Sequence, residues 1–470
     1  MSEKQPLTAA ERISSLLDPA SFVETGAYIT ARSTDFNLSA DSTPGDGVLT
    51  GYGLIDGRLV YVYSQDAAVL GGAVGEMHAK KIAGLYNLAM KTGAPVIGLL
   101  DSAGLRLQEA TDSLSAFGRI FQKMTMASGV IPQITAVFGT CGGGAAILSA
   151  LSDFTFLEEK NASLFVNSPN ALDGNYAEKL DTSKADFLNQ NTPLADRTAA
   201  GDEAVLSDIR TLISMLPANN GEEAVDVCED EINRTIPDIE TRKDDARALA
   251  ADIADDNQYY EIKKEFGVDV TTGFIRMNGA TVGFLGNQEN TLSVEGLAKA
   301  ESLVKFCDAF SIPVVTFTNV KGFAATVEEE KGIAAAAGRF AGVMAETSSP
   351  KVNVIVGDAF GSAYTIWNSK SVGADIVYAW KGARVGMMDP EMAVKIMYQD
   401  EIAAAGDTLA VIAEKKKEYE ALQASAESAA RRGYVDDLIE PDATRKRVIA
   451  ALEMLSTKRE ERPWKKHMSI

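Results

Sequence analysis

The sequence predicts an α/β protein built from two copies of one unit in tandem. Three observations lead to this prediction: similar blocks of sequence recur at one constant offset, apolar β-type runs alternate with helical patterns inside each block, and a glycine-rich turn follows the same run in both. Strands alternating with helices are typical of helices packed on a sheet, and a fixed offset indicates duplication of one structural unit.

Prolines and glycines that flank the buried strands define this offset. Each copy contains a proline, an apolar run and a glycine, as in "PVIGLLDSAG" and "PVVTFTNVKG". The same offset of 218 in the numbering relates three pairs of positions: Pro95 and Pro313, Pro132 and Pro350, and Gly139 and Gly357. Upstream, "GYGLIDGRLVYVYSQD" resembles "GFIRMNGATVGFLGNQ" at an offset of 222, so both copies begin with equivalent short strands.

Helical spacing of apolar residues over 75–93 and 294–313 predicts a crossover helix at the same place in each copy. The seam between the copies is acidic and lacks β-type runs. We place the boundary near Arg234, which gives domains 1–233 and 234–470. Residues 244–262 of the seam are expected to be helical and to open the second domain. From Arg431 onward, the sequence predicts a short turn and an amphipathic helix.

Length and charge limit the classes of function. The chain has 470 residues, enough for two domains, and its 46% hydrophobic and 24% charged residues are typical of a globular protein. The net charge of −21 argues against nucleic acid or an anionic membrane as partner. We see no membrane span and no signal peptide. The cysteines form no metal or disulfide pattern, so we expect a cytoplasmic protein.

Histidine is scarce in this sequence. There are two: His467 in a charged C-terminal stretch, and His78, which we expect on the surface of the helix over 75–93. Neither has the neighbours of a catalytic triad or the spacing of a metal site, so we expect no metal. Any catalysis should therefore rest on groups other than imidazole.

The glycine-rich turns are the strongest functional signal. "GTCGGGAAILSAL" places three consecutive glycines, residues 142–144, between a buried strand and a helix, and Gly361 begins the equivalent turn. Small residues at such a corner leave backbone N–H groups free to bind an oxyanion or a phosphate. No Walker pattern follows and no lysine is placed to reach a terminal phosphate, which favours the oxyanion. Two such corners suggest two carbonyl-like substrates that meet.

Several segments resemble the carboxyltransferase subunits of biotin-dependent acyl-CoA carboxylases and decarboxylases. The most specific are "VLGGAVGEMHAKKI", "ASGVIPQITAVFGTCGGGAAILSALSDFTFL", "GFIRMNGATVGFLGNQ" and "GADIVYAW", and the likeness runs in order from about residue 14 to residue 439. The family includes propionyl-CoA carboxylase β chains and subunits of sodium-pumping methylmalonyl-CoA and glutaconyl-CoA decarboxylases. The resemblance implies a tandem pair of crotonase-like (ClpP/crotonase) domains, in agreement with the repeat.

The resemblance implies transfer of a carboxyl group between carboxybiotin and a short-chain acyl-CoA such as propionyl-CoA or methylmalonyl-CoA. Coenzyme A is then part of the substrate, bound mainly by the N-terminal domain, and biotin binds the C-terminal domain of a second subunit. Gly143 and Gly144 match the oxyanion pair for the thioester enolate. Ser362 and Ala363 match the pair for the biotin ureido oxygen. Biotin exchanges the proton with the acyl α-carbon, so no protein base is required.

Further substrate-binding positions follow from the same resemblance. They are Gly71, Gly72, Ala103, Gly104, Gly142 and Ala145 in the first domain, and Gly322, Phe323, Gly361, Tyr364 and Thr365 in the second.

The resemblance also implies partners. It calls for a biotin carboxyl carrier protein, for a biotin carboxylase or membrane decarboxylase subunits, and for a homo-hexamer. "LAMKTG", at 88–93, resembles the signature around a biotinylated lysine. However, Lys91 ends a helical pattern before a buried strand, whereas a biotinyl lysine needs an exposed hairpin. We therefore expect biotin on a separate carrier chain.

Some positions depart from the family pattern. The second-domain loop, usually PGFxPG, is "VKGFAATVEEEKG" here, and Ser362 stands where glycine is usual. These changes leave open whether the loop from Lys321 to Glu330 lowers activity. Two interpretations are a carboxylase subunit and a subunit of a sodium-pumping methylmalonyl-CoA or glutaconyl-CoA decarboxylase. The changes motivate a third, a catalytically inactive assembly subunit. Carboxylation and decarboxylation use the same geometry, so the sequence leaves the direction, the acyl group and the identity of the partner subunits open.

Overall fold

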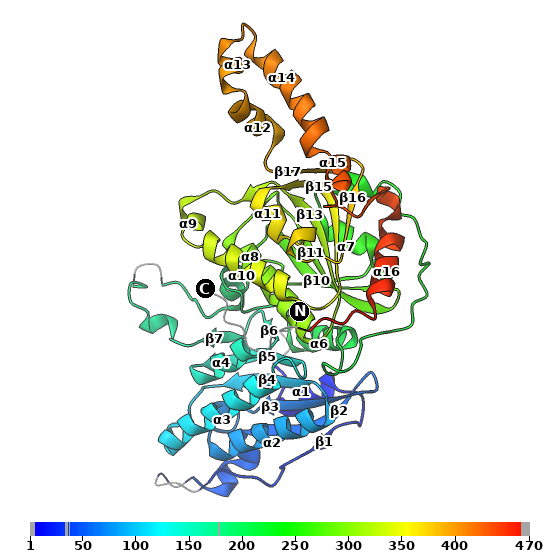
Figure 1. Ribbon diagram of the computed structural model, residues 1–470. Coiled ribbons are helices and arrows are strands. Elements are labelled where there is room, and N and C mark those ends of the chain that lie inside the picture. The colour runs from blue at the N-terminus through cyan, green and yellow to red at the C-terminus, as the bar shows by residue number, and fades with distance from the viewer. Residues whose placement is uncertain (1–4, 33–35, 37, 177–178, 462–470) are drawn as a thin grey trace. The chain divides into compact units, whose positions relative to one another are not determined.

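A computed structural model describes residues 5–461 apart from 33–35, 37 and 177–178. The chain divides into two compact units, Met1–Ala224 and Val225–Ile470, drawn from blue to green and from green to red in Figure 1. The division falls inside the acidic seam, somewhat before Arg234.

The first unit is organised around one sheet. Its strand order in the described residues is β1-β2-β3-β4-β5-β6-β8, with β7 paired to β5. β2 and β3 form an antiparallel hairpin, whereas β3, β4, β5 and β6 run parallel. The strands are β1 (Val23–Glu24), β2 (Val48–Ile55), β3 (Arg58–Gln65), β4 (Val96–Ser102), β5 (Gln133–Gly142), β6 (Phe154–Glu158), β7 (Ser163–Phe165) and β8 (Arg197–Ala199).

Helices connect the parallel strands of the first unit. They are α1 (Ala9–Leu16), α2 (Glu76–Thr92), α3 (Thr111–Ala127), α4 (Gly144–Leu151), α5 (Ala185–Asn191) and α6 (Asp202–Met215). The buried faces of α2 and α3 form one apolar core with the central strands, including Ile82, Ile120 and Val137. Burial of these side chains holds the carboxyl ends of β4 and β5 side by side.

The second unit repeats this plan. Its strand order in the described residues is β9-β10-β11-β13-β15-β16-β18, with β17 paired to β15 and a separate pair β12-β14. The strands are β9 (Tyr259–Ile262), β10 (Val270–Met277), β11 (Ala280–Asn287), β12 (Thr291–Leu292), β13 (Val314–Val320), β14 (Gly322–Phe323), β15 (Lys351–Phe360), β16 (Ile376–Trp380), β17 (Arg384–Gly386) and β18 (Asp437–Ile439).

The helices of the second unit include one extension without a counterpart of similar length in the first unit. They are α7 (Ala246–Ile253), α8 (Val294–Ala309), α9 (Val327–Glu330), α10 (Ile333–Glu346), α11 (Gly361–Ile366), α12 (Pro390–Met397), α13 (Gln399–Ala404), α14 (Thr408–Tyr419), α15 (Ala426–Arg431) and α16 (Thr444–Leu455). α12, α13 and α14 project away from the sheet of this unit (Figure 1), and α13 and α14 bury none of their residues.

The predicted duplication is confirmed by the two strand orders. β2-β3-β4-β5-β6-β8 corresponds in order to β10-β11-β13-β15-β16-β18, and β7 and β17 each add to the strand that precedes the glycine corner. The expected crossover helices are α2 and α8, and the C-terminal amphipathic helix is α16. The expectation for 244–262 is corrected: α7 ends at Ile253, and β9 follows as an edge strand on β10 because its alternate residues Tyr260 and Ile262 are buried.

A polar side chain behind the corner is repeated in both units. A Cβ built on Gly139 would lie 2.3 Å from Oδ1 of Asp101. A Cβ built on Gly357 would lie 2.4 Å from Oδ1 of Asn319. Asp101 and Asn319 are related by the repeat offset, so both copies keep a glycine where this side chain crosses the next strand.

A buried lysine on the crossover helix makes the same kind of hydrogen bond in both units. Lys81 of α2 and Lys299 of α8 are also related by the repeat offset, and both are buried. Lys81 Nζ donates to the carbonyl oxygen of Val48, the first residue of β2. Lys299 Nζ donates to the carbonyl oxygen of Val270, the first residue of β10, at 2.7 Å. Each lysine therefore fastens the start of the sheet to the crossover helix, with its charge satisfied by backbone oxygens.

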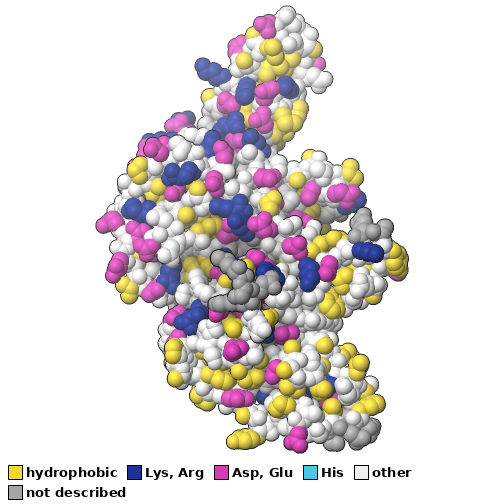
Figure 2. All heavy atoms as spheres, turned by 180° about the vertical axis from the view of Figure 1, so that it is seen from behind, with side chains coloured by type: hydrophobic (Ala, Val, Ile, Leu, Met, Phe, Trp, Pro, Cys, Tyr) yellow, Lys and Arg dark blue, Asp and Glu magenta, His cyan; other side chains and the backbone are white. Residues whose placement is uncertain are grey.

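None of the helices in the described ranges combines the length and apolar character that crossing a membrane requires. On the face shown in Figure 2, Asp and Glu side chains lie among Lys and Arg side chains.

A pair of equivalent aspartates differs in its charge environment. Asp153 accepts the N–H of Gln133 and Asp375 accepts the N–H of Lys351, both at 2.8 Å. Asp375 also pairs with Lys458 at 2.9 Å, but no described cation pairs with Asp153. Burial raises the pKa of Asp153 to about 7.

We predict that Asp153→Asn stabilises the first unit at alkaline pH. The folded pKa lies above the unfolded value of about 3.9, so ionisation between pH 4 and pH 7 costs folding free energy that asparagine avoids. The difference in unfolding free energy between Asp153→Asn and the unsubstituted chain should therefore grow from pH 4 to pH 7 and stay constant above pH 7. We expect about 1 kcal/mol, because the Asp153 side chain keeps some contact with water. Urea unfolding at pH 5 and pH 8 measures it.

Asp375→Asn is the matched control. It leaves Lys458 without its carboxylate, so it should destabilise at both pH values. Equal effects of the two substitutions at pH 8 would contradict the prediction.

Candidate active site

The first corner joins β5 to α4 through Gly142, Gly143 and Gly144. Gly143 has φ +59° and ψ −122°, a conformation that side chains disfavour. A Cβ built on it would meet nothing within 4 Å. Glycine is therefore required at this position by the backbone and not by a lack of space. The turn places the first N–H groups of α4 at the carboxyl end of a central strand.

The other candidates of the first domain lie beside this corner. β4 ends just before Ala103 and runs parallel to β5 up to the corner. Ala103 N–H donates to the carbonyl oxygen of Gly71 at 2.9 Å. A Cβ on Gly104 would lie 2.7 Å from the Gly142 carbonyl oxygen, and one on Gly72 would lie 2.1 Å from the backbone of β4. The structure thus brings three small-residue segments to one edge of the sheet.

The hydrogen bonds at the first corner change the expected pair of donors. Gly143 N–H donates to the carbonyl oxygen of Phe165, the last residue of β7, at 2.9 Å. Among the described residues, the N–H groups of Gly144 and Ala145 have no acceptor, as is normal in the first turn of a helix. In this conformation the amides open to a ligand are those of Gly144 and Ala145, not of Gly143 and Gly144. Sequence reasoning missed Phe165, because nothing in "SLFVNS" indicates which strand β7 joins.

The second corner has the same backbone form. Gly361 has φ +64°, and Ser362 keeps a negative φ, so its N–H is held as a glycine N–H would be. In the described part of the chain, the N–H groups of Ser362 and Ala363 have no acceptor. Tyr364 is buried, and burial raises the pKa of its hydroxyl to about 12, so it stays neutral. The Thr365 hydroxyl donates to the Gly361 carbonyl oxygen at 3.1 Å.

The remaining candidates of the second domain, Gly322 and Phe323, form β14. This short strand pairs with β12 and packs against α11. Although the loop departs from the family pattern, Gly322 and Phe323 still form a short strand beside the second corner.

Charged side chains lie beside the second corner. Arg384 donates two hydrogen bonds to the Asp358 carboxylate, Nε to Oδ1 at 2.7 Å and Nη2 to Oδ2 at 2.9 Å. Its guanidinium lies over the ring of Phe360, 5.3 Å from the ring centre. Lys321 Nζ lies 3.7 Å from Asp358 Oδ2. The hydrogen bonds from Arg384 to Asp358 raise the pKa of the guanidinium, which stays charged.

His78 is buried, and the expectation of a surface position was wrong. Its Nδ1 lies 3.0 Å from the carbonyl oxygen of Asp46, and its Nε2 lies 3.3 Å from Nε2 of Gln65. Burial lowers the pKa of His78 to about 3, so the ring is neutral and structural. His467 lies outside the described residues. No three His, Cys, Asp or Glu side chains within the described ranges form a group that could hold a metal ion.

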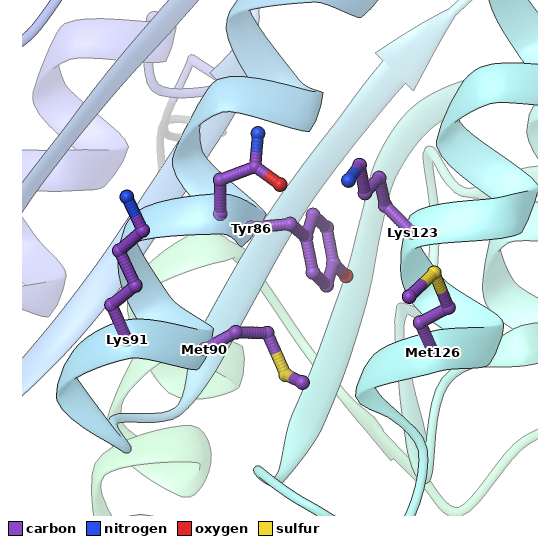
Figure 3. Close-up of a pocket in the computed structure, with 6 residues that line it drawn as sticks. Tyr86, Met90, Lys91, Lys123 and Met126 are labelled. Carbon is purple, nitrogen blue, oxygen red and sulfur yellow. The ribbon is translucent and has the colours of Figure 1, made fainter.

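A separate hollow of about 300 Å³ lies between α2 and α3 (Figure 3), lined by Tyr86, Asn87, Met90, Lys91, Lys123 and Met126. At this hollow α2 and α3 end, and the chain continues from them to the amino ends of β4 and β5 respectively. The first corner instead follows the carboxyl end of β5. The hollow is thus not part of the corner. Lys91 lies in the last turn of α2 and not on a hairpin.

Comparison with known proteins agrees with this geometry over the full chain. A family model described as carboxyl transferase domain matches residues 2–470. Methylmalonyl-CoA decarboxylase subunit alpha of Propionigenium modestum is 39% identical over 480 residues, 99% of this chain and 93% of that protein. Propionyl-CoA carboxylase beta chain of Roseobacter denitrificans gives the same identity and the same coverage.

A solved structure matches the fold closely. Transcarboxylase 12S, in a hexamer assembly with hydrolysed methylmalonyl-coenzyme A bound, aligns with a TM-score of 0.92 and 35% identity, over 98% of this chain and 92% of that one. The fold is therefore the duplicated crotonase-like fold that the sequence predicted. The chain belongs to the carboxyl transferase family, and it is a biotin-dependent acyl-CoA carboxyltransferase.

We predict that Gly143→Ala lowers the free energy of unfolding by about 1–3 kcal/mol, through backbone strain alone. Gly118→Ala in α3 is the matched control, because its Cβ would also meet nothing within 4 Å but its φ is helical. That substitution should be neutral or stabilising. Denaturant unfolding of both variants measures the difference, and equal stability would contradict the strain at Gly143.

Proposed function

We propose that the chain transfers a carboxyl group between carboxybiotin, held by a separate carrier protein, and a short-chain acyl-CoA. The observation that carries the proposal is the pair of equivalent corners, each with two backbone N–H groups open to an oxyanion. Propionyl-CoA and methylmalonyl-CoA are the proposed acyl pair. The two relatives at 39% identity are named for these compounds, which differ by one carboxyl group.

The first corner is proposed to hold the thioester oxygen as negative charge develops on it. Gly144 and Ala145 supply the two donors, and Gly143 supplies the turn that aims them. Backbone donors fixed before the reaction need no reorganisation, and each typically contributes a few kcal/mol to stabilising an enolate. Small residues at 71, 72, 103 and 104 let the neighbouring backbone segments approach closely beside this corner.

The second corner is proposed to hold the ureido oxygen of biotin through the N–H groups of Ser362 and Ala363. The residues present fit this group, since two backbone N–H groups without acceptors among the described residues are suited to a neutral, polar carbonyl oxygen. Bound biotin supplies the ring nitrogen that exchanges the carboxyl group and the proton. Tyr364 has a neutral hydroxyl, and the buried His78 ring lies against Asp46 and Gln65, in keeping with a mechanism in which no protein side chain takes the proton.

Partners and assembly follow from the same proposal. The carrier is a biotin carboxyl carrier protein, working with a biotin carboxylase or with membrane decarboxylase subunits, in the cytoplasm. The chain itself is proposed to form a homo-hexamer, as in the transcarboxylase 12S structure. The helical extension formed by α12, α13 and α14 supports a subunit contact, because it carries these exposed apolar side chains: Met392, Ile396, Met397 and Leu409.

A decarboxylase is the second candidate. The first relative reported above is a methylmalonyl-CoA decarboxylase subunit, and the same corners serve the reaction in either direction. An inactive assembly subunit is less well supported, because both corners keep their turn and their open amides.

Turnover with free biotin tests the proposal. Purified chain is incubated with biotin and methylmalonyl-CoA, malonyl-CoA or glutaconyl-CoA, and loss of the carboxyl group is measured. We expect biotin-dependent decarboxylation, fastest with methylmalonyl-CoA. Folded, oligomeric protein that turns over none of the three would favour the inactive subunit.

We predict that substitutions in the two corners have different effects. Gly144→Val should reduce turnover to background, because the new side chain would meet Phe117, 3.0 Å from a Cβ at 144, and would displace the N–H of residue 144. Effective loss of one oxyanion donor typically costs a factor of about 10²–10³ in turnover. Ala363→Val should impair the use of biotin and leave acyl-CoA affinity nearly unchanged. Calorimetry of acyl-CoA binding and turnover at varied biotin separate the two effects. Equal loss of acyl-CoA binding in both variants would contradict this division.

We predict a particle of about six times 50.1 kDa in solution. Covering the apolar side chains of the helical extension favours assembly. Light scattering at micromolar concentration measures the mass, and replacing Met392 and Ile396 by serine should lower it. A monomeric natural chain would contradict both the hexamer and a site shared between subunits.

A further inference from the structure

Lys321 stands at the edge of the second corner. It follows Val320 of β13, which pairs with Ala359 of β15 in parallel register, and Gly361 comes two residues after Ala359. Lys321 therefore leaves the sheet at the same carboxyl edge, and at nearly the same level, as the corner. It also precedes Gly322 directly, so it joins the sheet to the strand that packs on α11.

The ammonium of Lys321 is not needed to neutralise Asp358. That carboxylate already accepts two hydrogen bonds from Arg384, at 2.7 and 2.9 Å. Lys321 Nζ stays 3.7 Å away, beyond hydrogen-bond distance, and its side chain is 48% exposed. Among the described residues, Nζ of Lys321 makes no hydrogen bond, so its three donors remain open to a ligand. The paired charges of Asp358 and Arg384 lie on one side of the Lys321 ammonium.

The first corner has no such charge. The repeat offset of 218 places Ala103 at the position of Lys321 and Thr140 at that of Asp358. The pairing of β7 and β17 with their neighbours places Ser163 at the position of Arg384. The first corner is thus uncharged where the second carries an ammonium, an asymmetry that the shared fold does not require.

We propose that Lys321 binds the carboxylate of the group being transferred while biotin occupies the second corner. The inference rests on the proposed function, in which an anionic carboxylate must be held beside a neutral ureido ring. An ammonium with free donors is suited to that carboxylate, and a charge-assisted hydrogen bond is stronger than a neutral one. The first corner is proposed to bind the thioester carbonyl, which is neutral until the reaction begins. A lysine at the equivalent position there would have no carboxylate to bind.

Biotin-dependent decarboxylation of methylmalonyl-CoA by the full chain tests this role. Lys321→Ala, which copies Ala103 of the first corner, and Lys321→Gln should both lower turnover by about 10- to 100-fold. Lys321→Arg keeps the charge and should retain turnover within about threefold. The affinity for propionyl-CoA, which lacks that carboxylate, and the particle mass should be unchanged in all three variants, as measured by calorimetry and light scattering. Lys331→Ala is the matched control, an exposed lysine in the same loop that pairs with Glu328.

The outcomes separate the role of Lys321 from the proposed function. If Lys321→Ala turns over substrate as fast as the unsubstituted chain, with the same dependence on biotin, the role of Lys321 is overturned and the proposed function still stands. Loss of propionyl-CoA affinity or of particle mass in that variant would show a structural role and would also overturn the role of Lys321. An unsubstituted chain that turns over none of the three carboxylated acyl-CoA substrates would overturn the proposed function, and this inference with it.

Discussion

A glycine held at positive φ, directly after a central parallel strand, is the constraint on which the rest of the molecule depends. At Gly143 and at Gly361 the chain turns from strand to helix within one residue, and the next two N–H groups are left without acceptors among the described residues. The apolar cores beneath the sheets, and the side chains of Asp101 and Asn319 against Gly139 and Gly357, keep the preceding strands in register for that turn.

The two corners share a backbone but differ in how they are completed. In the first unit β7 takes up the Gly143 N–H through Phe165, and the positions equivalent to Asp358 and Arg384 hold uncharged residues. In the second unit Asp358 and Arg384 pair with each other at these positions. One frame therefore presents an amide site with uncharged residues at these positions and a second amide site bordered by fixed charges.

The sequence predicted the duplication, the crossover helices and the corners, because local signals mark them: prolines before strands, apolar periodicity, and small residues in a row. It could not predict features set by distant contacts. His78 lies on a helix, but its ring turns inward toward Asp46 because the loop before β2 folds over it. Residues 259–262 have no helix-breaking signal and become a strand because β10 offers an open edge. The role of Phe165 depends on pairing between segments that no local pattern connects.

Lys81 and Lys299 have a consequence for how the two halves diverged. Each half has its own internal fastening between the first strand and the crossover helix, and neither fastening draws on residues of the corner. A substitution at one corner therefore leaves the lysine hydrogen bonds of both halves in place. The halves are independent in this mechanical sense, and the chemistry of one ligand could change over evolutionary time while the recognition of the other was inherited intact.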